Sequence, residues 1–97
     1  MTIAELQERF VRALAQRCTD IADLIDDGND LERLMRGFHS LAGIAGTYGY
    51  DEVTEVSREC ELCCASAIEQ ARALNAADRA RLIAGIEAIR RYAVRSN

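Results

Sequence analysis

Apolar side chains recur at close to the 3.6-residue period of an α-helix along four separate stretches of the chain. The first stripe comprises Ile3, Leu6, Phe10, Leu14, Cys18, Ile21 and Ile25. The second comprises Leu31, Leu34, Phe38, Leu41 and Ala45. The third comprises Val53, Val56, Cys60, Cys63, Ala67 and Leu74, and the fourth Leu82, Ile86, Ile89 and Ala93. This pattern predicts four amphipathic helices.

The ends of these stretches carry boundary signals of their own. Thr2, with Glu5 three positions later, predicts a capping box at the start of the first helix. Gly28 suits the left-handed position that follows a helix. The later helices are predicted to begin at Asn29 or Asp30, near Asp51, and at Asn75 or Asp78. Each stretch therefore reads as a separate helix with a short connection to the next.

Four amphipathic helices joined by short turns can bury all their stripes against one another. The simplest arrangement is an all-α, antiparallel up-down four-helix bundle. The chain contains no proline, which agrees with a helical fold. Its 97 residues have room for one domain, which we expect to span residues 1–97.

Charge and hydropathy narrow the classes of partner. The net charge is −4, and the twelve basic residues, all arginine, are scattered instead of forming the basic patch that nucleic-acid binding requires. No apolar run approaches the roughly 20 residues that span a bilayer, and the N-terminus lacks a signal-peptide core. We therefore expect a cytoplasmic protein with free thiols, without nucleic-acid or membrane partners. The initial methionine favours a free-standing protein over a piece of a longer one.

The chain has a single histidine, His39, in the second helical stretch. With about 100° between successive residues, His39 falls at the edge of the buried stripe and not in it. Three residues are expected between the imidazole and the core, namely Met35, Ala42 and Gly46. Others are expected on the solvent side, among them Glu32, Arg36 and Gly43. The spacing therefore predicts an exposed imidazole.

Gly43 stands one turn after His39, at the i+4 position beside it on the helix surface. A glycine inside a helix costs about 1 kcal/mol relative to alanine. It leaves open space beside an imidazole that is partly unprotonated near neutral pH. This combination favours a nucleophile that another protein can approach. The plainer alternative is an inert surface histidine, with glycines that permit close helix packing and a turn.

The segment "HSLAGIAGTYGY" resembles the signature of histidine-containing phosphotransfer (HPt) domains. It is similar also to the phosphoryl-accepting N-terminal domain of chemotaxis histidine kinases. The matching positions are His39, Leu41, Gly43, Ala45, Gly46 and Gly49. Because that family is a four-helix bundle with its histidine on the second helix, the resemblance extends over the whole chain.

The resemblance implies a phosphorelay intermediate. His39 would accept a phosphoryl group on Nε2 from a receiver-domain aspartate and pass it to another receiver. The implied partners are response-regulator receivers and a hybrid sensor kinase, and the protein would act as a monomer. No cofactor is expected on this chain, because Mg²⁺ belongs to the receiver. No nucleotide site and no cluster of carboxylates around His39 are expected.

The resemblance also assigns roles to the neighbours of His39. Receivers would dock around the imidazole, with apolar contact from Met35 and Ala42 and with access at Gly43 and Gly46. Glu32 and Arg36 would tune partner choice at the rim. Many members carry a lysine where this chain has Ala42. Arg36, three residues before His39, is the nearby cation that could replace it as a charge helper.

Two other functions stay open. A helical module of the same shape could bind a receiver or kinase without relaying phosphate. Alternatively, Cys60, Cys63 and Cys64, which share one helix face, could bind a metal ion with Cys18 or His39 as fourth ligand. We expect instead that these cysteines pack in the core, because structural zinc sites usually take paired cysteines from turns and not from the middle of a helix.

Overall fold

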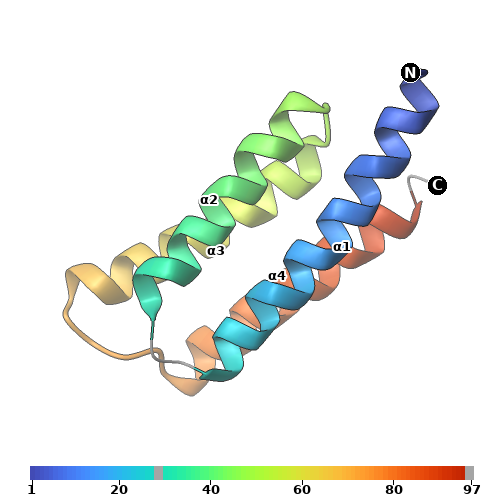
Figure 1. Ribbon diagram of the computed structural model, residues 1–97. Helices are drawn as coiled ribbons and strands as arrows, with labels where there is room; N and C mark the ends of the chain where they lie inside the picture. Colours follow the sequence, from blue (N-terminus) through green and yellow to red (C-terminus); the bar gives the residue numbers. More distant parts are fainter. Residues whose placement is uncertain (28–29, 96–97) are drawn as a thin grey trace.

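The structure is a computed structural model that describes residues 1–27 and 30–95, with side chains through Tyr92. Its helices are α1 (Ile3–Asp27), α2 (Leu31–Thr47), α3 (Asp51–Glu69) and α4 (Ala76–Arg95). The prediction of an all-α fold is confirmed over the described residues (Figure 1). The predicted C-terminal role of Gly28, the alternative cap Asn29 and the side chain of Ala93 lie outside the described part.

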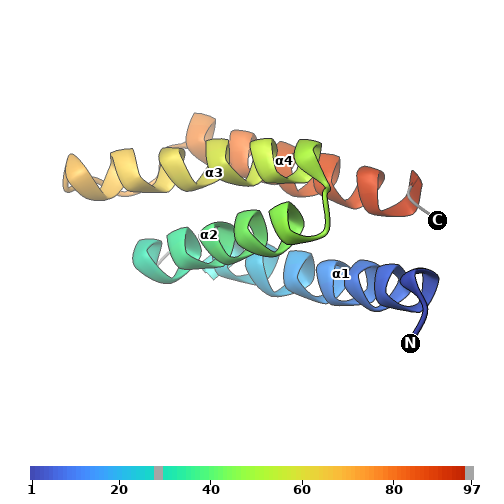
Figure 2. The ribbon, with the colours of Figure 1, turned by 90° about the horizontal axis from the view of Figure 1, so that it is seen from above.

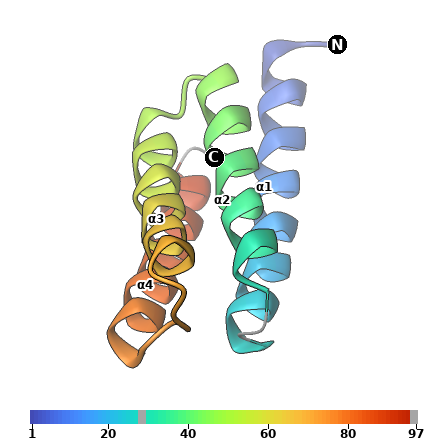
Figure 3. The same cartoon turned by 90° about the vertical axis from the view of Figure 1, so that its left-hand side faces the viewer.

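The four helices lie side by side in two layers, α1 with α2 and α3 with α4 (Figures 2 and 3). Each helix packs against its neighbours around a square: α1 on α2, α2 on α3, α3 on α4 and α4 on α1. The contact between α2 and α3 is the most extensive. The first turns of α1 and the last turns of α4 lie at the same end of the bundle (Figure 1).

The predicted stripes form the core, with one exception at the N-terminus. Ile3 and Leu6 are 76% and 38% exposed, and α1 is buried only from Phe10 onward. The ring of Phe10 stacks on Tyr48 and Tyr50, with centroids 4.8 and 4.6 Å away. These tyrosines lie in the turn between α2 and α3, and α1 extends past that turn (Figure 2). The first two turns of α1 therefore lie beyond the helices that would cover them.

The helix starts follow the predicted caps. The Glu5 N–H donates to the Thr2 hydroxyl at 3.1 Å, which confirms the first cap. At α2 the Asp30 carboxylate accepts from the N–H three residues later at 2.9 Å. Asn75 and Asp78 cap α4 reciprocally, each side chain accepting from the other residue's backbone N–H, at 2.8 and 3.1 Å. These bonds satisfy donors that a helix start leaves unpaired.

Both α2 and α3 are followed by a residue in the left-handed conformation, and the end of α3 differs from the prediction. After α2, Gly49 has φ +78°, and the next N–H donates to the Ala45 carbonyl at 2.9 Å. After α3, Ala71 has φ +52°, and the Arg72 N–H donates to the carbonyl five residues back at 3.0 Å. This is the hydrogen-bond pattern of a helix stop. The prediction that Leu74 belongs to the third helix was therefore wrong: it lies in the connection to α4, where it is buried.

Candidate functional site

His39 lies in the middle of α2, on the side away from the core. Its neighbours Phe38 and Leu41 are fully buried, whereas 77% of the His39 side chain is exposed. The prediction of an exposed imidazole at the edge of the buried stripe is therefore confirmed. Because α2 packs on both α1 and α3, this imidazole is carried by a helix that is held from two sides.

A carboxylate from the neighbouring helix orients the imidazole. Glu61 Oε1 lies 2.7 Å from His39 Nδ1, and 25% of the Glu61 side chain is exposed. An ionised carboxylate can only accept hydrogen bonds, so Nδ1 carries the proton. In the neutral ring Nε2 is then the unprotonated nitrogen, with a free lone pair. Nε2 has no hydrogen-bond partner in the part of the chain that the structure describes.

A hollow of about 370 Å³ opens beside the ring. From α2 it is lined by His39, Ala42 and Gly43, and from α3 by Arg58, Glu61, Leu62 and Ala65. A Cβ added at Gly43 would meet no atom within 4 Å, so the flank of the ring is open. Leu62 is 68% exposed, so an aliphatic side chain reaches solvent beside the ring. The site therefore combines an oriented imidazole, an open flank and one exposed apolar group.

A family model described as Hpt domain matches residues 5–92. The chain belongs to the Hpt domain family. Comparison with curated proteins and with solved structures gives no match. Membership implies phosphotransfer in two-component signalling and interaction with receiver domains or kinases. Among the described residues, no helix is both long and apolar enough to cross a membrane.

The hollow of this Hpt domain unites some of the predicted site residues and leaves others outside. Ala42 and Gly43 line it with His39, although Ala42 is only 5% exposed. Four other predicted residues are not among those that line it, namely Glu32, Met35, Arg36 and Gly46. Of these, Met35 is half-buried against the core, and the other three are exposed. Their predicted parts in docking and charge stay predictions.

The contribution of α3 was missed at the sequence level. No cluster of carboxylates was expected around His39, and the structure places a single one there, Glu61. The α3 residues that line the hollow stand at positions 58, 61, 62 and 65. This spacing puts them on one helix face. The sequence offers one signal for this face, namely Leu62, a large aliphatic residue that lies outside the predicted buried stripe. The pattern alone cannot align this face with His39, because that alignment depends on the turn between the helices.

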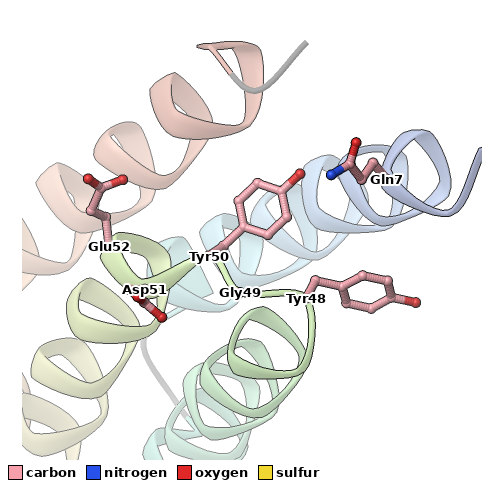
Figure 4. Close-up of a pocket in the computed structure, with 6 residues that line it drawn as sticks. All are labelled: Gln7, Tyr48, Gly49, Tyr50, Asp51 and Glu52. Carbon is pink, nitrogen blue, oxygen red and sulfur yellow. The ribbon is translucent and has the colours of Figure 1, made fainter. Parts of the chain in front are cut away.

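A second and larger hollow, of about 460 Å³, lies at the turn between α2 and α3 (Figure 4). It is lined by Gln7, Tyr48, Gly49, Tyr50, Asp51 and Glu52. The Tyr50 ring projects from the turn toward α1, which carries Gln7. No histidine or thiol lines this hollow. Its tyrosines are explained by their stacking on Phe10, so the candidate site is placed at His39 and not in this hollow.

The four cysteines pack in the core, as predicted. Cys18, Cys60, Cys63 and Cys64 are all free and buried. Burial raises the pKa of Cys60 and of Cys64 to about 12, so both are neutral thiols at physiological pH. Among the residues that the structure describes, no group of three or more histidine, cysteine, aspartate or glutamate side chains is placed to hold a metal ion.

Proposed function

We propose that this antiparallel up-down bundle is a phosphorelay intermediate that carries a phosphoryl group on His39, on its second helix. The observation that carries the proposal is the contact between His39 Nδ1 and Glu61 at 2.7 Å on a side chain that is 77% exposed. That contact selects Nε2 as the nucleophile and holds the ring still. Membership in the Hpt family supplies the reaction class.

In the proposed step the Nε2 lone pair attacks the phosphorus of a receiver's aspartyl phosphate. The N–P bond forms as the P–O bond to the aspartate breaks, and its electron pair leaves with the receiver's carboxylate. The proton stays on Nδ1, and the positive charge that develops on the ring faces the Glu61 carboxylate. Glu61 thus acts as a positioning residue, as the third group does in a nucleophile–base–carboxylate constellation. Attack by a second receiver's aspartate on the same phosphorus reverses the step.

The remaining requirements of the reaction fall to the partner. Phosphoryl transfer depends mainly on positioning and charge neutralisation, and we propose that the receiver contributes the Mg²⁺. We further propose that receivers and a hybrid sensor kinase dock around His39 as partners of a monomer. Leu62, Ala42 and Met35 would provide apolar contact. Glu32 and Arg36 at the rim would influence association rate and partner choice more than affinity.

The test is phosphotransfer from a phosphorylated receiver to the purified protein. The label should be acid-labile and alkali-stable, as expected for a phosphoramidate. The variant His39→Gln should fold normally and take no label, because its amide is not a nucleophile. Circular dichroism and thermal unfolding verify the fold. Labelling of His39→Gln at the wild-type rate would rule out this assignment.

Glu61→Ala tests the positioning role in the same assay. A hydrogen bond to a charged group is worth about 1.5–3 kcal/mol, and partial exposure places Glu61 at the low end, so we expect about a tenfold slower transfer. Glu61→Gln keeps an acceptor oxygen but loses the charge, and it should fall between Ala and wild type. Binding of a receiver without any labelling of the wild-type protein would instead indicate a non-catalytic binding module.

A further inference from the structure

The hollow beside His39 contains one cation, and it comes from α3. Arg58 lines the hollow together with His39, Gly43 and Glu61. Its side chain is exposed, and it forms no ion pair or hydrogen bond with any residue that the structure describes. Glu61, three residues further along the same helix face, is engaged with His39 instead. Arg58 is therefore a guanidinium without a structural task beside an oriented nucleophile.

The proposed reaction requires positive charge in the hollow beside His39. The transferred group carries negative charge on three oxygens, and its neutralisation is a large part of catalysis. α2 supplies no cation here, because Ala42 occupies the position one turn after His39 and lines the hollow with a methyl group. Arg36, one turn before His39, is outside the lining of the hollow.

We propose that Arg58 contacts the phosphoryl oxygens on His39 and is the residue of this chain that neutralises their charge. The planar guanidinium can donate two parallel N–H bonds to two phosphoryl oxygens, a geometry suited to phosphate. Arg58 and Glu61 then divide the work: the carboxylate faces the ring nitrogen that keeps its proton, and the guanidinium faces the phosphoryl group on the other nitrogen. This inference rests on the proposed function of His39.

The test compares Arg58→Ala with Arg33→Ala, a matched change of an exposed arginine on α2 that lies outside the hollow. Each variant is labelled by two donors, a phosphorylated receiver and the small molecule phosphoramidate. Arg58→Ala should slow labelling by both donors by about tenfold, because the lost contact is to the phosphoryl group itself. Arg58→Lys keeps the positive charge but loses the two parallel N–H donors of the guanidinium, so it should recover part of the rate. Arg33→Ala should stay within about twofold of wild type with phosphoramidate.

Three outcomes would overturn the inference. If Arg58→Ala slows only the receiver, Arg58 is a docking residue and does not touch the phosphoryl group. If Arg58→Ala labels at the wild-type rate with both donors, the charge is neutralised elsewhere. If Arg33→Ala loses as much with phosphoramidate, the loss is not specific to this hollow. Failure of the wild-type protein to label on His39 with either donor refutes the proposed function instead, so the two failures are distinguishable. The double variant Ala42→Lys, Arg58→Ala should regain rate with both donors if a cation in this hollow is what matters.

Discussion

Replacing Gly43 by alanine should stabilise the protein and slow phosphotransfer at once. A Cβ at this position meets no atom within 4 Å, so the added methyl group causes no clash in the free protein. Alanine in a helix is favoured over glycine by about 0.8–1.0 kcal/mol. For a domain of this size 1 kcal/mol corresponds to about 4–8 °C in Tm. The unfolding midpoint of Gly43→Ala should therefore rise by several degrees.

The cost should appear in the transfer from a receiver. The methyl group stands at the flank of His39, where the aspartyl phosphate must approach Nε2 in line. A displacement of about 1 Å at a reacting centre can cost about a hundredfold in rate, which sets the upper limit. We expect Gly43→Ala to slow receiver transfer by about tenfold or less, and Gly43→Leu by at least tenfold. Rapid-quench transfer kinetics and thermal unfolding measure the two effects.

Two controls separate crowding from other causes. Phosphoramidate is small, so its rate of labelling His39 should change little in Gly43→Ala. Ala71→Gly removes a left-handed alanine just after the end of α3 and should also stabilise, by about 1 kcal/mol, without slowing either donor. If Gly43→Ala transferred from receivers at the wild-type rate, the open flank would not be the reason for a glycine there.

Two further predictions concern the fold that holds the site. A Cβ at Gly85 would lie 2.5 Å from the buried Cys60 sulfur, so Gly85→Ala should lower the free energy of unfolding in urea by about 1–3 kcal/mol. Adding Cys60→Ala to that variant should relieve most of the loss. Additive losses would contradict this contact. The hydrogen bond from Arg72, with the Asn75 N–H, holds the pKa of Asp78 below its ordinary value of 3.8. The stabilisation that these hydrogen bonds give through the ionised Asp78 is therefore complete above its ordinary pKa of 3.8. It is lost as the pH falls through the lower pKa that Asp78 has in the folded protein. Thermal melts should show a smaller loss of stability between pH 5 and pH 3 for Asp78→Asn than for wild type, and equal losses would refute the role.

The elements that follow from local pattern were predictable, and those that depend on packing at the ends were not. Leu34 and Phe38 were placed in the core by their spacing, and they are 1% and 0% exposed. Ile3 has the same spacing but is 76% exposed, because burial requires a neighbouring helix that the periodicity of one segment cannot guarantee. Leu74 follows the period of α3 without belonging to it, because the left-handed Ala71 ends the helix and alanine carries no signal for that conformation.

The same distinction explains why half of the site could be found in the sequence. His39 and Gly43 are neighbours on one helix, so their relation follows from the geometry of that helix alone. Glu61 is 22 positions away from His39, and its contact depends on how α3 is rotated and shifted against α2. The residues that share one helix face can be predicted from the sequence. The alignment of two helix faces against each other depends on the connection that joins the helices.

Gly49 sets that register. Its left-handed conformation ends α2 and lets α3 begin at Asp51, and the Thr54 hydroxyl then lies 3.5 Å from the Ala42 carbonyl oxygen. One residue more or fewer in this turn would rotate α3 by about 100° relative to α2. Such a rotation would carry Glu61 away from Nδ1, and His39 would lose both its fixed tautomer and its fixed orientation. The third glycine after the histidine therefore bears on the same site as the first: Gly43 leaves the flank of the imidazole open, and Gly49 brings to it the carboxylate that leaves Nε2 as the unprotonated nitrogen.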